Sequence, residues 1–227
     1  MQTFTILFCL LLLCQCKTML YSATVPAAPA ELAKLRDAKI IQGGVLLQYT
    51  SAEDEKELSA INETLTTLWQ EEKPKQKSVS NEEFCQHFNE EEKQQIQTEF
   101  ARYLDFSDKT RQLLQSKLPN LRYIFYLSIE TGKERRYEDF LLQQSYNTPT
   151  GIVYEEKPIG ITERNVRAIP LIYDIQEGKI VAAASYQRMF RRQRMLLKKG
   201  ESTDEYPSLS FAKVYRTTIQ ASLEILP

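Results

Sequence analysis

The apolar positions along the chain change their spacing several times, and each change predicts a new element. Between residues 39 and 50 the apolar side chains surround Gly43-Gly44, which predicts a strand with a break or a bulge. Ser51 then serves as the expected cap of a helix with a single apolar stripe. The stripe consists of Leu58, Ile61, Leu65, Leu68 and Trp69.

Three helix starts follow in the segment from residue 80 to residue 118. Ser80 precedes Glu83 by three positions and Asn89 precedes Glu92 by three, which is the spacing of a capping box. A third helix is expected over residues 107–118, ending before Pro119.

The second half of the chain is dominated by strands. Residues 121–129 are almost all apolar or aromatic, which predicts a strand covered on both faces. Residues 134–160 mix strand-like pieces, such as 137–142 and 151–154, with turn residues. Residues 162–175 and 180–186 flank a turn and predict a hairpin, in which Pro170 is expected to mark a bulge or an edge. Ser208 is expected to open a last helix that reaches the C-terminus.

This order of elements predicts an α/β (α+β) fold with a single mixed β-sheet, helices packed on its faces and a C-terminal helix. Residues 4–13 are apolar except for Thr5, and this run is too short for a spanning helix and typical of a signal peptide. We therefore expect a signal peptide over residues 1–20, a Pro/Ala-rich tether and lead-in over 21–38, in which residues 24–30 form neither helix nor strand, and one α/β domain over 39–227.

Two ways of processing the signal remain open. The run Leu13-Cys14-Gln15-Cys16 is similar to a bacterial lipobox, which makes Cys16 the candidate lipid attachment site. The alternative is simple cleavage near Ser22-Ala23 or within residues 27–30, where small residues have suitable spacing. Either way, the protein is expected to be exported to the bacterial periplasm or anchored to the membrane of the cell envelope.

The charge balance is close to neutral, with 29 Lys and Arg against 30 Asp and Glu, which argues against a nucleic-acid partner. Three of the four cysteines lie in the signal region, so Cys85 alone belongs to the folded body and no internal disulfide framework is expected. His87 is the only histidine. At a helical spacing of two residues it does not face Cys85, so we predict neither a nucleophile–base pair nor a metal site, and no cofactor.

Acidic clusters offer no better catalytic candidate. Glu82-Glu83 and Glu90-Glu91-Glu92 stand at expected helix starts, where negative charge complements the helix dipole. Glu155-Glu156 lies beside Lys157 without the apolar surroundings that would raise a carboxyl pKa. No catalytic residue is therefore predicted.

The segment 188–199 is the most distinctive local feature, because its cations alternate with Met, Phe and Leu. Such a pattern suits an anionic membrane surface or an acidic protein partner. A solvated loop or strand end is the alternative. The candidate contact residues are Arg188, Arg191, Arg192, Arg194, Lys198 and Lys199.

Several segments together resemble a group of bacterial envelope lipoproteins whose domain is similar to that of the curli-secretion outer-membrane lipoprotein. They are Ser51-Ala52-Glu53-Asp54 after the first strand, the run from Leu121 to Glu130, the hairpin Tyr173-Asp174 through Gly178-Lys179, and the closing helix. Pro170 and Gln15 depart from the family pattern.

The resemblance and the targeting signal together favour a non-enzymatic binding or assembly module of the cell envelope. Its expected partner is an envelope protein or an anionic membrane surface, and a homo-oligomer is a further interpretation. The alternative function is a secreted hydrolase of unrecognised type, which would need a cleft with converging titratable groups.

Overall fold

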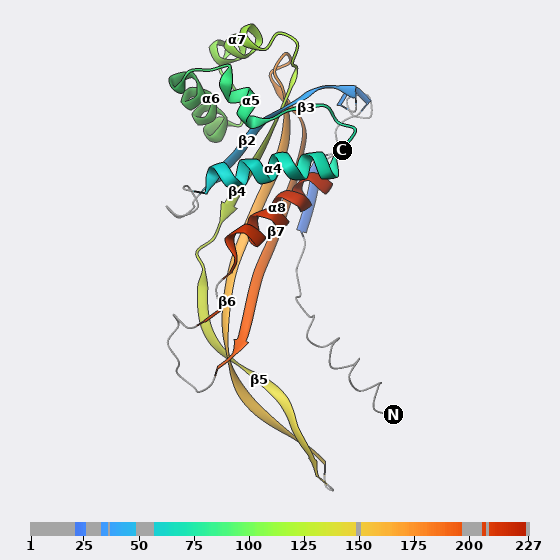
Figure 1. Cartoon of the computed structure of the whole chain (residues 1–227), viewed down its shortest axis with the longest axis vertical. Helices are drawn as coiled ribbons and strands as arrows, with labels where there is room; N and C mark the ends of the chain where they lie inside the picture. The colour runs from blue at the N-terminus through green and yellow to red at the C-terminus, as the bar shows by residue number, and fades with distance from the viewer. Residues whose placement is uncertain are drawn as a thin grey trace. The chain divides into compact units, whose positions relative to one another are not determined.

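The computed structural model describes residues 21–25, 33–35, 37–48, 57–148, 151–196, 206–207 and 209–225 (Figure 1). It confirms the α/β class, with a mixed seven-stranded sheet, packed helices and a C-terminal helix. The strands are β1 (Tyr21–Val25), β2 (Ile40–Gln48), β3 (Ser78–Val79), β4 (Tyr123–Thr131), β5 (Arg135–Thr148), β6 (Gly151–Asp174) and β7 (Lys179–Met195). The helices are α4 (Leu58–Glu72), α5 (Asn81–Gln86), α6 (Glu90–Tyr103), α7 (Asp108–Lys117) and α8 (Phe211–Glu224).

The strand order in the sheet is β1-β7-β6-β4-β2-β3, and β5 pairs with β6. By its contacts the chain divides into two compact units. The larger unit comprises residues 21–133, 165–188 and 210–227, and the smaller one includes 134–164 and 189–209.

Strand β4 is the centre of the larger unit. It pairs in parallel with β2 and antiparallel with β6, and helices cover both of its faces. Tyr126 belongs to an apolar cluster with side chains of α5, α6 and α7. Its neighbour Phe125 points to the other face and meets Trp69 of α4, with ring centroids 5.0 Å apart. Burial on both faces explains why the sequence of β4 shows no polar alternation, as expected.

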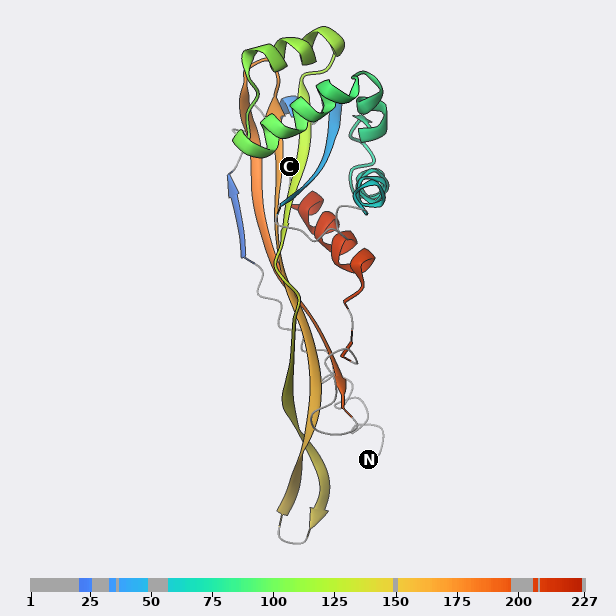
Figure 2. The same cartoon turned by 90° about the vertical axis from the view of Figure 1, so that its left-hand side faces the viewer.

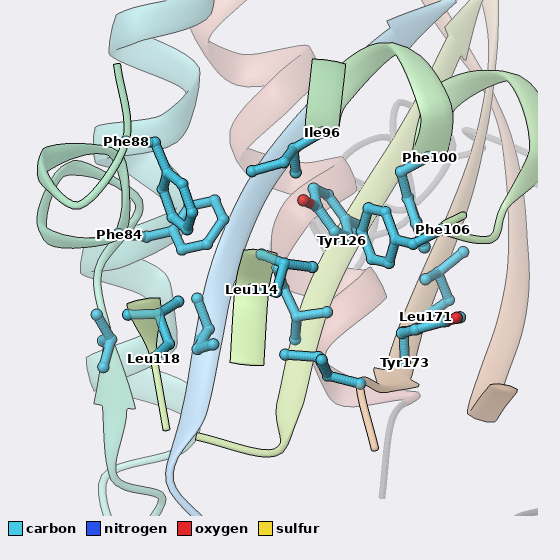
Figure 3. Packing of buried hydrophobic residues seen from close by; sticks show 14 of the residues in the cluster. Phe84, Phe88, Ile96, Phe100, Phe106, Leu114, Leu118, Tyr126, Leu171 and Tyr173 are labelled. Carbon is cyan, nitrogen blue, oxygen red and sulfur yellow. The ribbon is translucent and has the colours of Figure 1, made fainter. Parts of the chain in front are cut away.

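Aromatic side chains fill the cluster on the α5–α7 face (Figure 3). The ring of Phe100 from α6 stacks on Tyr126 at a centroid distance of 4.2 Å and meets Tyr173 of β6 edge to face at 5.7 Å. Phe106, from the loop before α7, contacts the same tyrosine at 5.1 Å. These rings join two helical segments to two strands, so one cluster fixes how α6 and α7 lie on the sheet.

Helices α4 and α8 lie side by side in the larger unit (Figures 1 and 2). Each buries one stripe, represented by Leu65 and Leu68 in α4 and by Ile219 and Leu223 in α8. At their exposed margin, Arg216 of α8 forms an ion pair with Glu71 of α4 at 3.1 Å.

The helix caps agree with the sequence wherever the expected capping residues are described. Ser80 accepts a hydrogen bond from Glu83 N at 3.2 Å, and Asn89 and Glu92 form the expected reciprocal capping box. Ser107 caps α7. Two starts differ from expectation: α4 begins at Leu58 after Glu57, while Ser51 lies outside the described residues, and α8 is capped by Ser210 and not by Ser208.

The expected interruption of the first strand is a β-bulge, because the register between β2 and β4 shifts between Gln42 and Gly44. A side chain at Gly43 would place its Cβ within 2.8 Å of several atoms of the Tyr126 ring. Gly44 has a φ of +111°, which L side chains rarely adopt. The backbone there is held by side chains: Asn62 of α4 accepts from Val45 N at 2.9 Å, and Asn81 of α5 donates to the Gly43 carbonyl at 2.8 Å.

The β6–β7 hairpin confirms the expected turn. Asp174 is 1% exposed, and its Oδ1 accepts hydrogen bonds from Gln176 N and Glu177 N at 2.9 and 3.0 Å. Its other oxygen accepts from Arg122 Nε at 2.7 Å. Pro170 marks neither a bulge nor an edge: it lies opposite Leu127 in an unbroken ladder, on a strand that has neighbours on both sides. Proline has no N–H, so this buried position of β6 lacks one backbone donor.

Three other expectations need correction. Thr24 and Val25 do not belong to a tether, because they pair with Ala184 and Ala183 in the β1–β7 ladder. The strand-like pieces at 137–142 and 151–154 are longer than expected, because β5 covers Arg135–Thr148 and β6 continues from Gly151 to Asp174. Strand β7 does not stop at Tyr186 but continues to Met195, so most of the basic segment is a strand. In each case backbone pairing holds a sequence that lacks a regular apolar pattern.

The smaller unit is built on the antiparallel β5–β6 ladder, which runs from Arg135 opposite Glu163 to Thr148 opposite Gly151. A bulge interrupts it between Gln144 and Tyr146. Gly160 is required here, because its missing side chain leaves room for Leu196 and Tyr206, whose atoms lie about 3.0 Å from where a Cβ would stand.

Candidate interaction surface

The arginines of the basic segment lie on the end of β7, where Arg191, Arg192 and Arg194 are exposed. Arg191 Nη2 lies 3.8 Å from Asp139 Oδ2 of β5. The remaining cations, Lys198 and Lys199, lie outside the described residues, as does Cys16. The structure therefore brings together three of the six expected contact residues on one strand end.

Arg188 differs from the other three because it is half-buried and belongs to the larger unit. Burial raises the pKa of Tyr186, and the nearby positive charge of Arg188 partly offsets this effect. Arg188 thus sits beside a buried phenol, which gives it a packing role that the sequence pattern did not indicate.

Exposed apolar side chains are concentrated in the smaller unit. Of the ten large apolar side chains that are exposed in the described residues, seven belong to it, and Leu142 and Tyr154 are the most exposed of these, at 64% and 59%. The seven are Tyr137, Phe140, Leu141, Leu142, Tyr154, Met189 and Met195. Exposed apolar side chains that share a face are typical of interaction surfaces, and Phe140 and Leu142 share one face of β5.

Sequence reasoning identified only the β7 part of this surface. The β5 part carries a signal that was missed: the fifteen positions from Phe140 to Tyr154 contain no charged residue, in a chain of which 26% is charged. Charged residues stand at both ends of this stretch, Asp139 before it and Glu155 after it.

Polar contacts order the β5–β6 ladder beside these apolar residues. The Tyr137 hydroxyl donates to Glu163 Oε2 at 3.0 Å. Burial and this hydrogen bond to a carboxylate raise the pKa of Tyr137, so the phenol stays protonated at neutral pH. Farther along, Lys157 lies 3.8 Å from Glu155. Glu163 and Glu155 are therefore partners of neighbouring side chains.

Cys85 and His87 line different hollows. Cys85 lines a polar groove of about 800 Å³ between α4 and α5, together with Asn62, Thr67 and Asn81. His87 lines a smaller hollow with Lys117 and Leu118. Burial raises the pKa of the Cys85 thiol, which keeps it neutral and weakly nucleophilic. The geometry does not assemble a thiol–imidazole pair.

The acidic clusters occupy the positions that the sequence predicted. Glu82 and Glu83 lie in the first turn of α5, and Glu90, Glu91 and Glu92 in that of α6. In the part of the chain that the structure describes, no group of three or more His, Cys, Asp or Glu side chains could hold a metal ion. None of the helices described is both long enough and apolar enough to cross a membrane.

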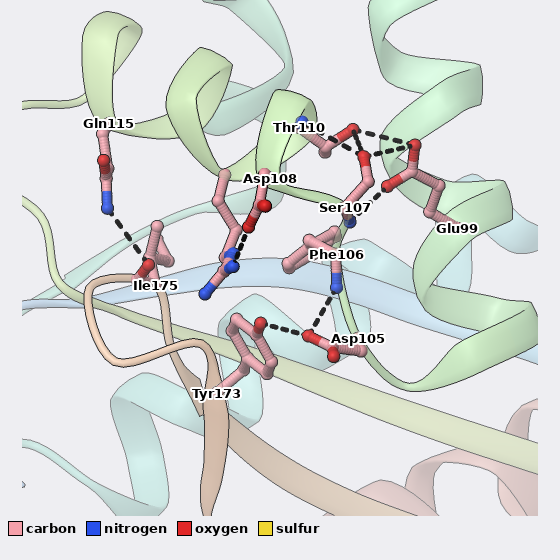
Figure 4. A network of polar contacts seen from close by, with 10 residues as sticks. Glu99, Asp105, Phe106, Ser107, Asp108, Thr110, Gln115, Tyr173 and Ile175 are labelled. Carbon is pink, nitrogen blue, oxygen red and sulfur yellow. Dashed lines mark hydrogen bonds and ion pairs between the residues drawn. The ribbon is translucent and has the colours of Figure 1, made fainter.

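A dense polar network joins α6 to the start of α7 (Figure 4). Glu99 accepts hydrogen bonds from Ser107 N at 2.9 Å, from Thr110 Oγ1 at 2.9 Å and from Gln95 Nε2 at 3.0 Å. Burial alone would raise the pKa of Glu99, but the donated hydrogen bonds outweigh it and hold the pKa below its usual value. The Glu99 carboxylate therefore fixes the loop before α7, which is a structural role.

Comparison with known proteins gives no family. No protein-family model matches the sequence, and no curated protein matches it. Among solved structures, the PelC dodecamer from Paraburkholderia phytofirmans is 12% identical, with 91% of this chain and 94% of that chain covered and a TM-score of 0.36.

Two further structures give similar values. Lipoprotein GNA1162 from Neisseria meningitidis is 12% identical, with 82% and 96% covered and a TM-score of 0.35. A putative neuraminyllactose-binding hemagglutinin homolog from Helicobacter pylori is 7% identical, with 82% and 75% covered and a TM-score of 0.31. One of these proteins is a lipoprotein by name, but likeness at this level carries no argument about function.

Proposed function

We propose that this protein is an exported, non-enzymatic binding module of the bacterial cell envelope, and that the smaller unit contacts an anionic membrane surface. The concentration of exposed apolar side chains in that unit, beside Arg191, Arg192 and Arg194, carries the proposal. Apolar side chains gain free energy by leaving water for the headgroup region, and each nearby cation adds about 1 kcal/mol at an anionic surface.

The expected signal peptide and the candidate lipid site at Cys16 support the same location. A lipid on Cys16 would keep the domain close to a membrane, so a weak surface contact would be sufficient. Intact-mass analysis of the protein isolated from envelope fractions tests this part. We expect loss of the leader, and a diacylglyceryl increment on Cys16 would separate lipidation from simple cleavage. A full-length chain in the cytosol would contradict the proposal.

A triple variant tests the membrane contact. We expect Arg191→Gln/Arg192→Gln/Arg194→Gln to reduce co-sedimentation with vesicles containing anionic lipid, and the difference from the parent to shrink as salt increases. The matched control is Lys75→Gln/Lys77→Gln/Lys109→Gln, which removes three exposed cations from the larger unit.

The outcomes of this comparison are distinct. Equal binding of the arginine variant and the parent at low salt would contradict the membrane contact. Binding to envelope proteins without binding to vesicles would indicate that the surface contacts an acidic protein partner and not a membrane. A large loss of melting temperature in the arginine variant would show that these side chains stabilise the fold.

A further inference from the structure

Helix α4 carries a polar stripe beside its apolar one. The stripe has helical spacing and lines the groove of about 800 Å³ between α4 and α5, to which Cys85 also belongs. Its residues are Ser59, Asn62, Glu63, Thr66 and Thr67. Among the described residues that line the groove, the Cys85 side chain alone carries no hydroxyl, amide or charged group. A ligand of this groove would thus be held chiefly by hydrogen bonds.

The backbone of β2 orients two amides of the groove. Asn62 Oδ1 accepts from Val45 N at 2.9 Å, and Asn81 Nδ2 donates to the Gly43 carbonyl at 2.8 Å. The atoms left for a ligand are therefore the Asn62 amide nitrogen, which donates, and the Asn81 amide oxygen, which accepts. Neither atom has a hydrogen-bond partner among the described residues. The groove thus contains one donor and one acceptor whose positions the strand fixes.

The hydroxyl of Thr66 is oriented in the same way. It donates to Gln42 Oε1 at 2.9 Å, and Gln42 is 1% exposed. Since the hydroxyl proton is used in this bond, the Thr66 oxygen can serve a ligand only as an acceptor. Three lining groups are therefore fixed by contacts with β2 before any ligand arrives, which reduces the entropy that binding costs.

Two ligand classes do not fit this lining. An anion would need free cations, but Lys93, the one cation among the described lining residues, is paired with Glu90 at 2.6 Å. A peptide would need apolar pockets for its side chains, or an open strand edge to which it could add. The lining offers no such pocket, and Asn62 and Asn81 already occupy the edge of β2 there.

Sugar hydroxyls match this lining better, because each of them both donates and accepts. The volume of the groove also lies within the range of about 300–1,000 Å³ that is usual for small-molecule sites. We propose that the groove between α4 and α5 binds a neutral saccharide, to which Asn62 donates and from which Asn81 accepts. The groove belongs to the larger unit, so this site goes beyond the proposed membrane contact and does not depend on it.

Calorimetric titration of the isolated protein tests the ligand class without any membrane. The neutral probes are maltotriose, cellotriose and triacetylchitotriose, and we expect at least one to bind with a dissociation constant of about 1 mM or lower. Deacetylated chitotriose, which is cationic, is the comparison, because Glu63 and Glu82 also line the groove. Binding of the cationic sugar alone, or of none of the four, would overturn the proposal.

An isosteric change at Asn62 tests its role as a donor. Asn62→Asp keeps an oxygen that accepts from Val45 N, but it replaces the donor in the groove by a second acceptor. We expect the dissociation constant of the bound saccharide to rise by about tenfold or more, while the melting temperature stays close to that of the parent. Unchanged affinity in Asn62→Asp would contradict the assigned role.

A second variant leaves the contacts with β2 intact. Ser59→Ala/Thr67→Ala/Gln86→Ala removes three exposed polar groups of the groove, of which only Thr67 forms a hydrogen bond, to a carbonyl of its own helix. We expect about fivefold weaker binding or more. The matched control is Gln70→Ala/Gln97→Ala/Thr98→Ala, which removes three exposed polar groups of α4 and α6 outside the lining and should bind as the parent does. Equal losses in both variants would argue against this groove.

The thiol of Cys85 reports on the location of the bound sugar. Cys85 is partly exposed and lines the groove, so a saturating concentration of the saccharide should slow its alkylation by iodoacetamide. Peptide mapping by mass spectrometry separates Cys85 from the other cysteines. The control is a sugar of the same set that does not bind, which should leave the rate unchanged. An unchanged rate with the binding saccharide would place the sugar elsewhere and overturn the proposal.

Discussion

Asn62 of helix α4 accepts the backbone hydrogen bond of Val45 in β2 that a neighbouring strand would otherwise accept. Its Oδ1 accepts the Val45 N–H at 2.9 Å, just after the bulge at Gly44. Beside it, Asn81 of α5 donates to the Gly43 carbonyl. Strand β3 is only two residues long, so these side chains satisfy backbone groups that no strand reaches. These two hydrogen bonds hold α4 and α5 against the edge of β2.

Replacing Asn62 should therefore destabilise the larger unit. Asn62→Ala leaves the part-buried Val45 N–H without its acceptor, and we expect a loss of about 1–3 kcal/mol in the free energy of unfolding, measured by urea denaturation. Glu63→Ala, at the next position of the same helix but exposed, is the control and should change little. Equal effects of the two substitutions would argue against the role of the Asn62–Val45 hydrogen bond.

Gly43 should tolerate no side chain. In Gly43→Ala the new methyl group overlaps the Tyr126 ring, which is fully buried and cannot move aside, so we expect a cost of about 1–3 kcal/mol. A smaller side chain at position 126 should reduce this cost. In a double-mutant cycle with Tyr126→Leu, the Gly43→Ala change should therefore cost less than in the parent. Additive effects would show that the strain arises elsewhere.

The ion pair of Asp174 with Arg122 should contribute strongly, because the carboxylate is almost completely buried. Asp174→Asn keeps an acceptor for the turn amides but removes the charge that Arg122 faces. We expect a loss of about 2–3 kcal/mol by chemical denaturation. Glu177→Gln removes the more exposed partner of the same guanidinium and should cost far less, as exposed pairs do. A similar cost for both would contradict the importance of burial.

Glu99 should make stability depend on pH. Its pKa is lower in the folded chain than in the unfolded chain, so its contribution is present above the unfolded pKa and is lost as pH falls through the folded value. Melting temperatures measured from neutral pH down to about pH 3 should fall less steeply in Glu99→Gln than in the parent. Parallel profiles would show that the carboxylate charge at Glu99 has no such effect.

Leu104 ends α6 in the left-handed region, with a φ of +52°, and donates its N–H to the Phe100 carbonyl. Glycine adopts this conformation without steric cost, and the Leu104 side chain is exposed. We expect Leu104→Gly to raise the free energy of unfolding by about 0.5–1 kcal/mol, by thermal or urea denaturation. Destabilisation would mean that contacts of the leucine side chain outweigh the backbone strain.

The parts of the fold that the sequence predicted are those whose signals are local. Ser80, Asn89 and Ser107 act within one helical turn, so their caps are visible in the sequence alone. Strand β4 was predictable because burial on both faces leaves a continuous apolar run. Ser210 was missed in favour of Ser208 because both residues are suitable caps and lie two positions apart.

In the smaller unit β5 was the harder strand to predict, because none of its described side chains is buried. Phe140, Leu141 and Leu142 are all exposed, so β5 shows no alternation that would identify a strand. The arginines of β7 were recognised as a group, but nothing local showed that they continue a strand from the hairpin. The polar role of Asn62 was also hidden, because its partner Val45 is seventeen residues away.

The contact between α4 and α8 has a consequence for the order in which the chain can fold. The first of these helices begins at Leu58, whereas the second begins at Phe211, close to the C-terminus. The packing of α8 against α4 therefore cannot form until residues 211–224 have been synthesised. Contacts this distant in sequence form late and slowly. The larger unit therefore completes its core only late in folding, when α8 packs against α4.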